Sequence, residues 1–539
     1  MKKPSIQCIL QQQEYVIMKD ITSYVYNFEE LIQGNFLYVD KTEYIWQLIR
    51  PSSAGYFLSR PRRFGKSLTV STLKAVFEGK KELFRGLALY NKPYNWKQYP
   101  VIHLSFGDFS SVMNTPEKLT DYLNTKIIQI SSQYQFVPLS NDPGLKFGEL
   151  IDYLAKQNQV VILVDEYDKP ILDNISNPQL VDIQKVLKGF YSVLKDRNAS
   201  ERFLFLTGVS KFSHVSLFSD LNNLTDISMD ARYATMFGYT QQELENSFRD
   251  RIETIAANQN MLADDFKTKL KEWYNGYRFH ANSQTVYNPV SIAKFFESNG
   301  EFNNYWFSTG TPSFLLELAK KRNFDFEKVL TDPVQGVAFS AYEIDRIDPL
   351  VLLLQTGYLT IKSTSEDFGV PLYQLDFPNL EVATAFNTYL LNCYTPYSRE
   401  QVDSLILDMA RAVRSGDANH FMELWQTYLA DIPYDIQLKH EKYYQTIFYT
   451  TFRTLGYTIK AESRTNKGRI DAVVSYGEWV YVIEFKLDKN ADIALDQIKQ
   501  NRYYQKYMHS GKRIVLIGAN FDFAERQLTD WEIEEVMTP

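Results

Sequence analysis

The chain has 539 residues, of which 45% are hydrophobic and 23% charged, and its formal net charge at pH 7 is -7. A chain of this length is expected to form three or four domains of about 150 residues, each with its own core. The negative net charge excludes a protein that is basic throughout. Any contact with nucleic acid therefore needs a local basic patch.

The number of cysteines and the length of the apolar segments indicate in which cellular compartment the protein lies. The two cysteines, Cys8 and Cys393, are too few for a disulfide framework or a structural zinc site. The apolar part of the N-terminal segment is too short for a signal peptide, and no segment approaches the length of about 18 apolar residues that spans a membrane. We therefore expect a cytoplasmic protein without a membrane span.

The first 225 residues alternate between apolar strands and helical segments. Residues 36–49 lead into the strand GYFLS, which is followed by a basic loop and by a helix over 67–79. Alternating strands and helices predict a parallel sheet with helices on both faces. The other predicted strands of this domain are 101–106, 160–166 and 202–210.

The rest of the chain divides in two. Residues 226–430 are predicted to be mainly helical, with a capping box of Thr240 and Glu243 at one helix start. Residues 431–539 are predicted to form a helix, a strand hairpin, a second helix and a final strand.

The basic loop RPRRFGKS (60–67) predicts a phosphate site. Gly65, Lys66 and Ser67 end the pattern G-x-x-x-x-G-K-[ST], in which backbone N–H groups surround phosphates, the lysine reaches the outer phosphates and the hydroxyl binds Mg²⁺. Arg60 stands where the first glycine of that pattern would be. Arg60, Arg62 and Arg63 are candidates for phosphate contacts, with solvated loop charges as the alternative.

The strand VVILVDE supplies the acids that such a site needs. Asp165 is predicted to bind Mg²⁺, and Glu166 to orient or activate the attacking water. Adjacent carboxylates repel and lose hydration at the end of a buried strand, so packing alone does not explain them. Thr207, at the end of LFLT, is a candidate sensor of the γ-phosphate, or else a satisfied hydroxyl at a strand end.

A second site is predicted near the C-terminus, where Asp471, Glu484 and Lys486 form the pattern D…E-x-K. Glu484 and Lys486 are two residues apart on an apolar strand, so they project from one face. If Gly477 and Glu478 form a two-residue turn, Asp471 lies opposite Glu484. Their β-carbons would then be about 4.5–5.5 Å apart, close enough for both carboxylates to hold one divalent ion.

Such an ion polarises a phosphodiester and lowers the pKa of a bound water, and Lys486 orients that water or stabilises the phosphate charge. Glu441, on the preceding helix, is a candidate for an additional carboxylate, and Gln497, on the following helix, is a candidate orienting residue. The alternative is a structural trio of cross-strand salt bridges.

Further motifs extend over nearly the whole chain: YVDKT at Tyr38, VDEYDKP at Val164, LTGVSKF at Leu206, WYNGYRF at Trp273, YNP at Tyr287, and the RID and EFK elements. With RPRRFGKS, they resemble a prokaryotic family that joins an AAA-ATPase-like domain to a C-terminal PD-(D/E)xK nuclease-like domain. The resemblance implies an α/β protein with a P-loop AAA-type ATPase domain at 1–225, a mainly helical middle region at 226–430 and a nuclease-like domain at 431–539. The family's nucleotide-site roles carry onto Gly65, Lys66, Ser67, Asp165 and Glu166, and its nuclease-site roles onto Asp471, Glu484 and Lys486.

We therefore expect ATP-regulated cleavage of nucleic acid, with DNA favoured, that uses ATP and Mg²⁺, with Mn²⁺ as an alternative ion at the nuclease site. The alternative function is a nucleotide-switched protein that binds DNA or a partner through a nuclease fold that does not cleave. The complete Asp, Glu and Lys set favours cleavage. Because AAA-type sites usually borrow an arginine from a neighbouring subunit, a homo-oligomer is also expected, with Arg232 and Arg278 as candidate donors.

Overall fold

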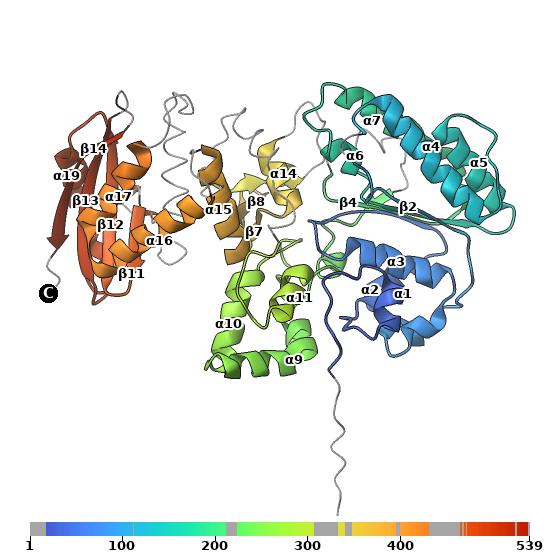
Figure 1. Ribbon diagram of the computed structural model, residues 1–539, viewed down its shortest axis with the longest axis horizontal. Helices are drawn as coiled ribbons and strands as arrows, with labels where there is room; N and C mark the ends of the chain where they lie inside the picture. The colour runs from blue at the N-terminus through green and yellow to red at the C-terminus, as the bar shows by residue number, and fades with distance from the viewer. Residues whose placement is uncertain are drawn as a thin grey trace, which may run out of the picture.

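A computed structural model of the chain describes residues 18–110, 113–211, 224–306, 332–339, 348–394, 399–430, 464–465, 468–469, 472–522, 525 and 527–536. Figure 1 shows an elongated arrangement, with the N-terminal domain at one end and a C-terminal sheet at the other. Helices and a small sheet lie between them.

The first domain contains the predicted parallel sheet. Its strand order is β2-β3-β4-β1-β5, and every neighbouring pair is parallel. Strand β1, which precedes the basic loop, thus lies inside the sheet between β4 and β5. The strands are β1 (Ala54–Ser59), β2 (Val101–Ser105), β3 (Val160–Asp165), β4 (Glu201–Gly208) and β5 (Leu224–Asp226).

Helices cover both faces of this sheet, with α1, α2 and α3 on one side and α4, α5 and α7 on the other (Figure 1). Strands β3 and β4 are therefore buried along their whole length, and each contains a continuous apolar run, at residues 160–164 and 203–206. Helices α4 and α5 begin in the expected way, because Thr115 and Asp142 accept capping bonds and a proline follows each cap. The elements are α1 (Phe28–Gln33), α2 (Thr42–Ile49), α3 (Lys66–Phe77), η1 (Lys81–Phe84), η2 (Ala88–Asn91), α4 (Pro116–Gln133), α5 (Pro143–Ala155), α6 (Lys169–Leu172), α7 (Leu180–Ser192) and η3 (Lys195–Ser200).

The middle region is mainly helical, as expected, and it also carries a three-stranded sheet of order β6-β8-β7. The predicted capping box is confirmed, because Thr240 and Glu243 bond reciprocally at the start of α9. Helices α9, α10 and α11 share a core of their own around Phe248, Tyr274 and Phe295. The elements are η4 (Ala231–Tyr233), α9 (Gln241–Asn258), α10 (Ala263–Tyr274), α11 (Pro289–Glu297), β6 (Val334–Gln335), η6 (Gly336–Phe339), α14 (Pro349–Thr356), β7 (Thr360–Asp367), β8 (Val370–Asp376) and α15 (Leu380–Tyr394).

The C-terminal sheet is mixed, with strand order β11-β12-β13-β14. Strands β11 and β12 form the predicted antiparallel hairpin, and β13 lies parallel to β12. A parallel neighbour requires a crossover connection, which α19 supplies. The elements are β9 (Arg464–Thr465), β10 (Gly468–Arg469), β11 (Ala472–Tyr476), β12 (Trp479–Leu487), α19 (Ala491–Asn501), η8 (Gln505–Tyr507), β13 (Arg513–Asp522) and β14 (Gln527–Val536).

Side chains of this sheet alternate between two cores, and α17 and α19 lie on opposite sides of it (Figure 1). The face opposite α19 is covered by α16 (Arg399–Ser415) and α17 (Ala418–Ala430). Tyr481 donates to the carbonyl of Val413 at 3.0 Å, and Gln426 donates to the carbonyl of Leu528 at 2.7 Å. We therefore propose that the C-terminal domain begins with α16 rather than at residue 431.

Within the described ranges, the structure holds no helix that is both long enough and apolar enough to cross a lipid bilayer.

Candidate functional site

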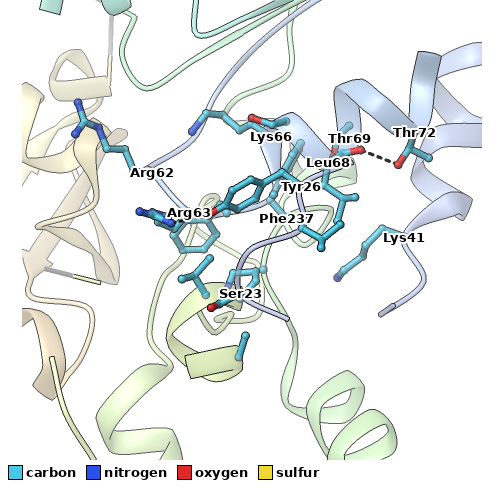
Figure 2. Close-up of a pocket in the computed structure, with 18 of the residues that line it drawn as sticks. Ser23, Tyr26, Lys41, Arg62, Arg63, Lys66, Leu68, Thr69, Thr72 and Phe237 are labelled. Carbon is cyan, nitrogen blue, oxygen red and sulfur yellow. Dashed lines mark hydrogen bonds between the residues drawn. The ribbon is translucent and has the colours of Figure 1, made fainter. Parts of the chain in front are cut away.

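A cavity of about 570 Å³ opens at the carboxyl ends of β1 and β3. Its wall includes residues 62–69 of the basic loop and helix α3, and also Glu166 and Asp168 after β3. Other parts of the wall come from the N-terminal segment, from residues 236–239 and from the start of α11. Figure 2 shows Tyr26 of the N-terminal segment and Phe237 near the basic loop and the start of α3. The cavity therefore joins the first domain to the middle region.

Gly65 and Lys66 form the N-terminal end of α3. Gly65 has φ +88°, in the left-handed region that glycine adopts freely, and no atom lies within 4 Å of where a β-carbon would be. Lys66 is buried, and its Nζ donates to the carbonyls of Arg60 and Pro61, both at 2.9 Å. Burial lowers the pKa of Lys66, and the nearby Glu166 and Asp165 oppose this shift. The free N–H groups of a helix start beside a buried lysine suit a phosphate.

Ser67 and Asp165 meet beside this helix start. Asp165 is buried, and burial raises its pKa to about 6 although the Ser67 hydroxyl donates a hydrogen bond to it. The Oδ1 atom of Asp165 has no hydrogen-bond partner among the described residues. A buried carboxylate oxygen without a partner, next to a hydroxyl, is the donor set that Mg²⁺ accepts. Glu166 lines the cavity, and its φ of +56° is an uncommon conformation for a glutamate.

Arg60 does not lie in this cavity. Its guanidinium is buried, where it donates to the carbonyls of Ser59, Ser228 and Tyr233 and packs on the ring of Phe279. Burial lowers the pKa of Arg60 to about 9. The prediction that Arg60 contacts phosphate does not agree with this position, because the side chain would have to leave three carbonyls. Instead, Arg60 anchors the loop at the position of the missing first glycine.

Arg62 and Arg63 both line the cavity. Figure 2 shows the side chain of Arg62 pointing away from Lys66, whereas Arg63 faces Tyr26. Arg63 Nη1 donates to the Tyr26 hydroxyl at 2.9 Å, and the φ of Arg63 is +70°. The phosphate roles of both arginines remain predictions.

Thr207 and Asp168 lie close to the acids of β3. Thr207 is fully buried on β4 outside the cavity wall, so its role as a sensor remains a prediction. Asp168 lines the cavity and accepts from the N–H of Ser210 at 2.7 Å and from its hydroxyl at 2.8 Å. The sequence pattern did not single out Asp168, although it lies within VDEYDKP. An added β-carbon at Gly208 would come within 2.5 Å of its Oδ1, so glycine is needed there.

Residues beyond the first domain hold the basic loop in shape. The Trp306 indole N–H donates to the carbonyl of Arg62 at 3.2 Å. Glu381, at the start of α15, accepts from the Trp306 N–H at 2.7 Å and from the Ser291 hydroxyl of α11 at 2.8 Å. Glu381 is fully buried, and burial raises its pKa to about 7. No sequence motif indicated this set of contacts.

The two arginines proposed as intersubunit donors are engaged within the chain. Arg232 pairs with Asp230 at 2.6 Å and is well exposed. Arg278 donates to the carbonyl of Lys362 at 2.9 Å. Arg232 is thus the more accessible of the two, and its role in an oligomer remains a prediction.

The hairpin register at the second site is confirmed. Ala472 pairs with Ile483 and Tyr476 with Trp479, so Gly477 and Glu478 form the two-residue turn. Asp471 directly precedes β11 but lies outside the described residues, as does Glu441. Across the described ranges, no three His, Cys, Asp or Glu residues are grouped for a metal ion.

Glu484, Lys486 and Gln497 are brought together. Glu484 is 3% exposed, Lys486 Nζ lies 3.0 Å from its Oε1, and Gln497 Nε2 donates to the same oxygen. Gln497 reaches it because α19 packs closely on β13 at Gly518, the residue that pairs with Glu484. A β-carbon on Gly518 would lie 2.5 Å from the carbonyl oxygen of Ala491. The sequence did not indicate this glycine, because the close approach depends on the three-dimensional packing.

Two families of known proteins match the two parts of the chain in which these sites lie. Residues 24–218 match a family described as predicted AAA-ATPase, and residues 439–531 match the PD-(D/E)XK nuclease superfamily. The cavity lies partly within the first match, and Glu484, Lys486 and Gln497 lie within the second.

Similarity to a single relative extends over nearly the whole chain. An uncharacterized protein in the vnfD 5' region of Azotobacter chroococcum mcd 1 is 36% identical over 527 residues, which cover 95% of this chain and 98% of the relative. The order of domains is therefore shared from end to end. The chain belongs to the family in which a predicted AAA-ATPase domain is followed by a domain of the PD-(D/E)XK nuclease superfamily.

Proposed function

We propose that the protein hydrolyses ATP in the N-terminal cavity and uses it to control metal-dependent cleavage of nucleic acid, with DNA as the favoured substrate, by the C-terminal domain. The observation that carries the proposal is that Lys66, Ser67 and Glu166 line one cavity, with Asp165 bonded to Ser67 beside it. These residues come from the carboxyl ends of β1 and β3, which lie on either side of β4, at the edge where nucleotides bind in open parallel sheets.

In the proposed ATPase site, the phosphates lie at the N-terminal end of α3. Lys66 leaves the carbonyls of Arg60 and Pro61 and binds the outer phosphates, which are stronger acceptors because they are charged. Ser67 and Asp165 would hold Mg²⁺, which when bound would neutralise charge on the phosphates. Glu166, which lines the same cavity, orients the attacking water.

In the proposed nuclease site, Glu484 and Asp471 would hold the divalent ion, Mg²⁺ or Mn²⁺, which when bound would polarise the phosphodiester and lower the pKa of a water. Gln497 fixes the Glu484 carboxylate by its hydrogen bond. Lys486, at 3.0 Å from the same carboxylate, is placed to orient the water or to stabilise charge on the phosphate.

The test measures ATP hydrolysis and the cleavage of labelled single- and double-stranded DNA side by side, with Mg²⁺ or Mn²⁺ and with or without ATP. Lys66→Ala should abolish nucleotide binding, and Lys486→Ala should abolish cleavage while ATP hydrolysis continues. Matched controls are Lys74→Ala, on the same helix as Lys66, and Lys489→Ala, exposed just after β12.

Two results would contradict the proposal. Unaltered ATP affinity in Lys66→Ala would remove the nucleotide assignment. Absence of cleavage by the wild-type protein on every DNA and RNA tried, with ATP hydrolysis intact, would instead favour a nucleotide-switched binding protein.

A further inference from the structure

Tyr26 and Arg63 bridge two walls of the cavity. Tyr26 belongs to the segment before α1, whereas Arg63 belongs to the basic loop, and both side chains line the cavity. Arg63 Nη1 donates to the Tyr26 hydroxyl at 2.9 Å. Figure 2 shows the two side chains facing each other beside Lys66. Arg63 therefore lines the same cavity as Lys66 and Ser67, the residues that are expected to contact the phosphates.

The backbone of Arg63 is in a conformation that arginine rarely adopts. Its φ is +70°, in the left-handed region that glycine enters without steric penalty. Left-handed residues other than glycine are disfavoured, and they concentrate at functional sites where surrounding structure holds them in place. The loop therefore places a strained arginine at the cavity wall, next to the lysine that follows Gly65.

The partner of Arg63 distinguishes it from two lysines that also line the cavity. Lys41 is paired with Glu243 at 2.7 Å, and Lys169 lies 3.4 Å from Asp173. Both lysines therefore already have an anionic partner. Arg63 donates to a neutral phenol, so exchanging that acceptor for a phosphate oxygen gives a charge-assisted bond, which is shorter and stronger.

We propose that Arg63 is a catalytic residue of the ATPase site that binds the terminal phosphate, and that its bond to Tyr26 breaks when the triphosphate binds. The inference rests on the proposed ATP hydrolysis. In that reaction the water oxygen bonds to the γ-phosphorus and the bond from phosphorus to the bridging oxygen breaks, giving ADP and phosphate. The water proton passes to Glu166 and then to solvent. Arg63 stabilises the charge that develops on the γ-phosphate oxygens.

Because Arg63 comes from the same chain as Lys66, hydrolysis does not require an arginine from a second copy. Turnover per chain should therefore be independent of protein concentration. Arg232→Ala, which removes the more accessible candidate for a donated arginine, should hydrolyse ATP like the wild type.

The decisive variant is Arg63→Gly in the full chain. Glycine adopts the left-handed backbone without strain, so thermal stability should be equal or higher, and unfolding cannot explain a loss of activity. We expect kcat for MgATP to fall by about 100-fold or more. ATP affinity should fall while ADP affinity stays within about twofold, because ADP has no terminal phosphate for Arg63 to bind. Arg63→Lys should restore part of kcat.

Tyr26→Phe tests the acceptor of the hydrogen bond from Arg63. It keeps the ring and removes the hydroxyl acceptor, so ATP should bind a few-fold more tightly. Tyr24→Phe is the matched control, because the Tyr24 side chain is 85% exposed and lies outside the cavity.

If the wild-type protein binds no ATP, the proposed function itself fails. If the wild type hydrolyses ATP and Arg63→Gly does so at the same rate, the role of Arg63 alone is overturned. Turnover that rises with concentration and disappears in Arg232→Ala would also overturn it.

Discussion

Replacing Gly518 with alanine is predicted to uncouple helix α19 from the C-terminal site. The new β-carbon would lie 2.5 Å from the carbonyl oxygen of Ala491 and would also contact the backbone nitrogen of Leu495. Both are backbone atoms, so no side chain can rotate to relieve the overlap. Ordinary contacts need about 3.5 Å, so α19 must retreat from β13 by roughly 1 Å.

A shift of this size has two consequences. Overpacking in a closely packed interior costs about 2 kcal/mol, which corresponds to roughly 30-fold more frequent local opening of α19. The same shift lengthens and weakens the bond from Gln497 Nε2 to Glu484. The orientation of the carboxylate is then less firmly fixed, and we expect cleavage to fall by about 10-fold or more.

The assay is hydrogen exchange of the peptide that covers α19, measured together with cleavage and ATP hydrolysis. Exchange in α19 should accelerate by about 30-fold, while the N-terminal domain exchanges as in the wild type. Gly189→Ala is a control that should change stability in the opposite direction. Gly189 lies exposed within α7, and no atom lies near the added β-carbon. That variant should gain up to about 1 kcal/mol. Wild-type protection of α19 together with wild-type cleavage in Gly518→Ala would refute the reasoning.

Three further predictions concern charge. Burial raises the pKa of Glu381 from 4.5 to about 7, so its contribution to stability is fully present below about pH 4.5 and is lost by about pH 7. That loss of stability amounts to about 3 kcal/mol. Glu381→Gln should therefore reduce the difference between the melting temperatures measured at about pH 5 and about pH 8. An unchanged difference would contradict the raised pKa of Glu381. Arg60→Met keeps apolar volume but leaves three carbonyls without a donor, and calorimetry should show destabilisation by about 3 kcal/mol. Asp471→Ala should eliminate cleavage and leave ATP hydrolysis intact, with metal-free stability equal or higher because it removes one of the two carboxylates that the hairpin register predicts to face each other; persistent cleavage would exclude Asp471 from the site.

Local patterns predicted the elements that depend on neighbouring residues. The spacing of Thr240 and Glu243 predicted a capping box, and it forms. The turn at Gly477 and Glu478 predicted the register of the hairpin, which the structure confirms up to Ala472. Strand alternation likewise predicted that Glu484 and Lys486 share a face, where they pair. In each case the geometry is set within one turn or one strand, so the sequence contains all the information that is needed.

The contacts that shape the basic loop come from far along the chain, and no local pattern contains them. As a cation in a phosphate-binding pattern, Arg60 is a candidate for a phosphate contact, with a solvated loop charge as the alternative. Its direction is instead set by the carbonyls of Ser228 and Tyr233 and by the ring of Phe279, which only the folded chain brings near. Trp306 likewise holds the loop from more than 200 positions away. A cation within a motif can therefore either anchor the loop or contact the ligand, and its neighbours in the folded chain determine which. Arg60 donates to carbonyls in the interior, whereas Arg63 donates to the phenol of Tyr26 at a cavity wall.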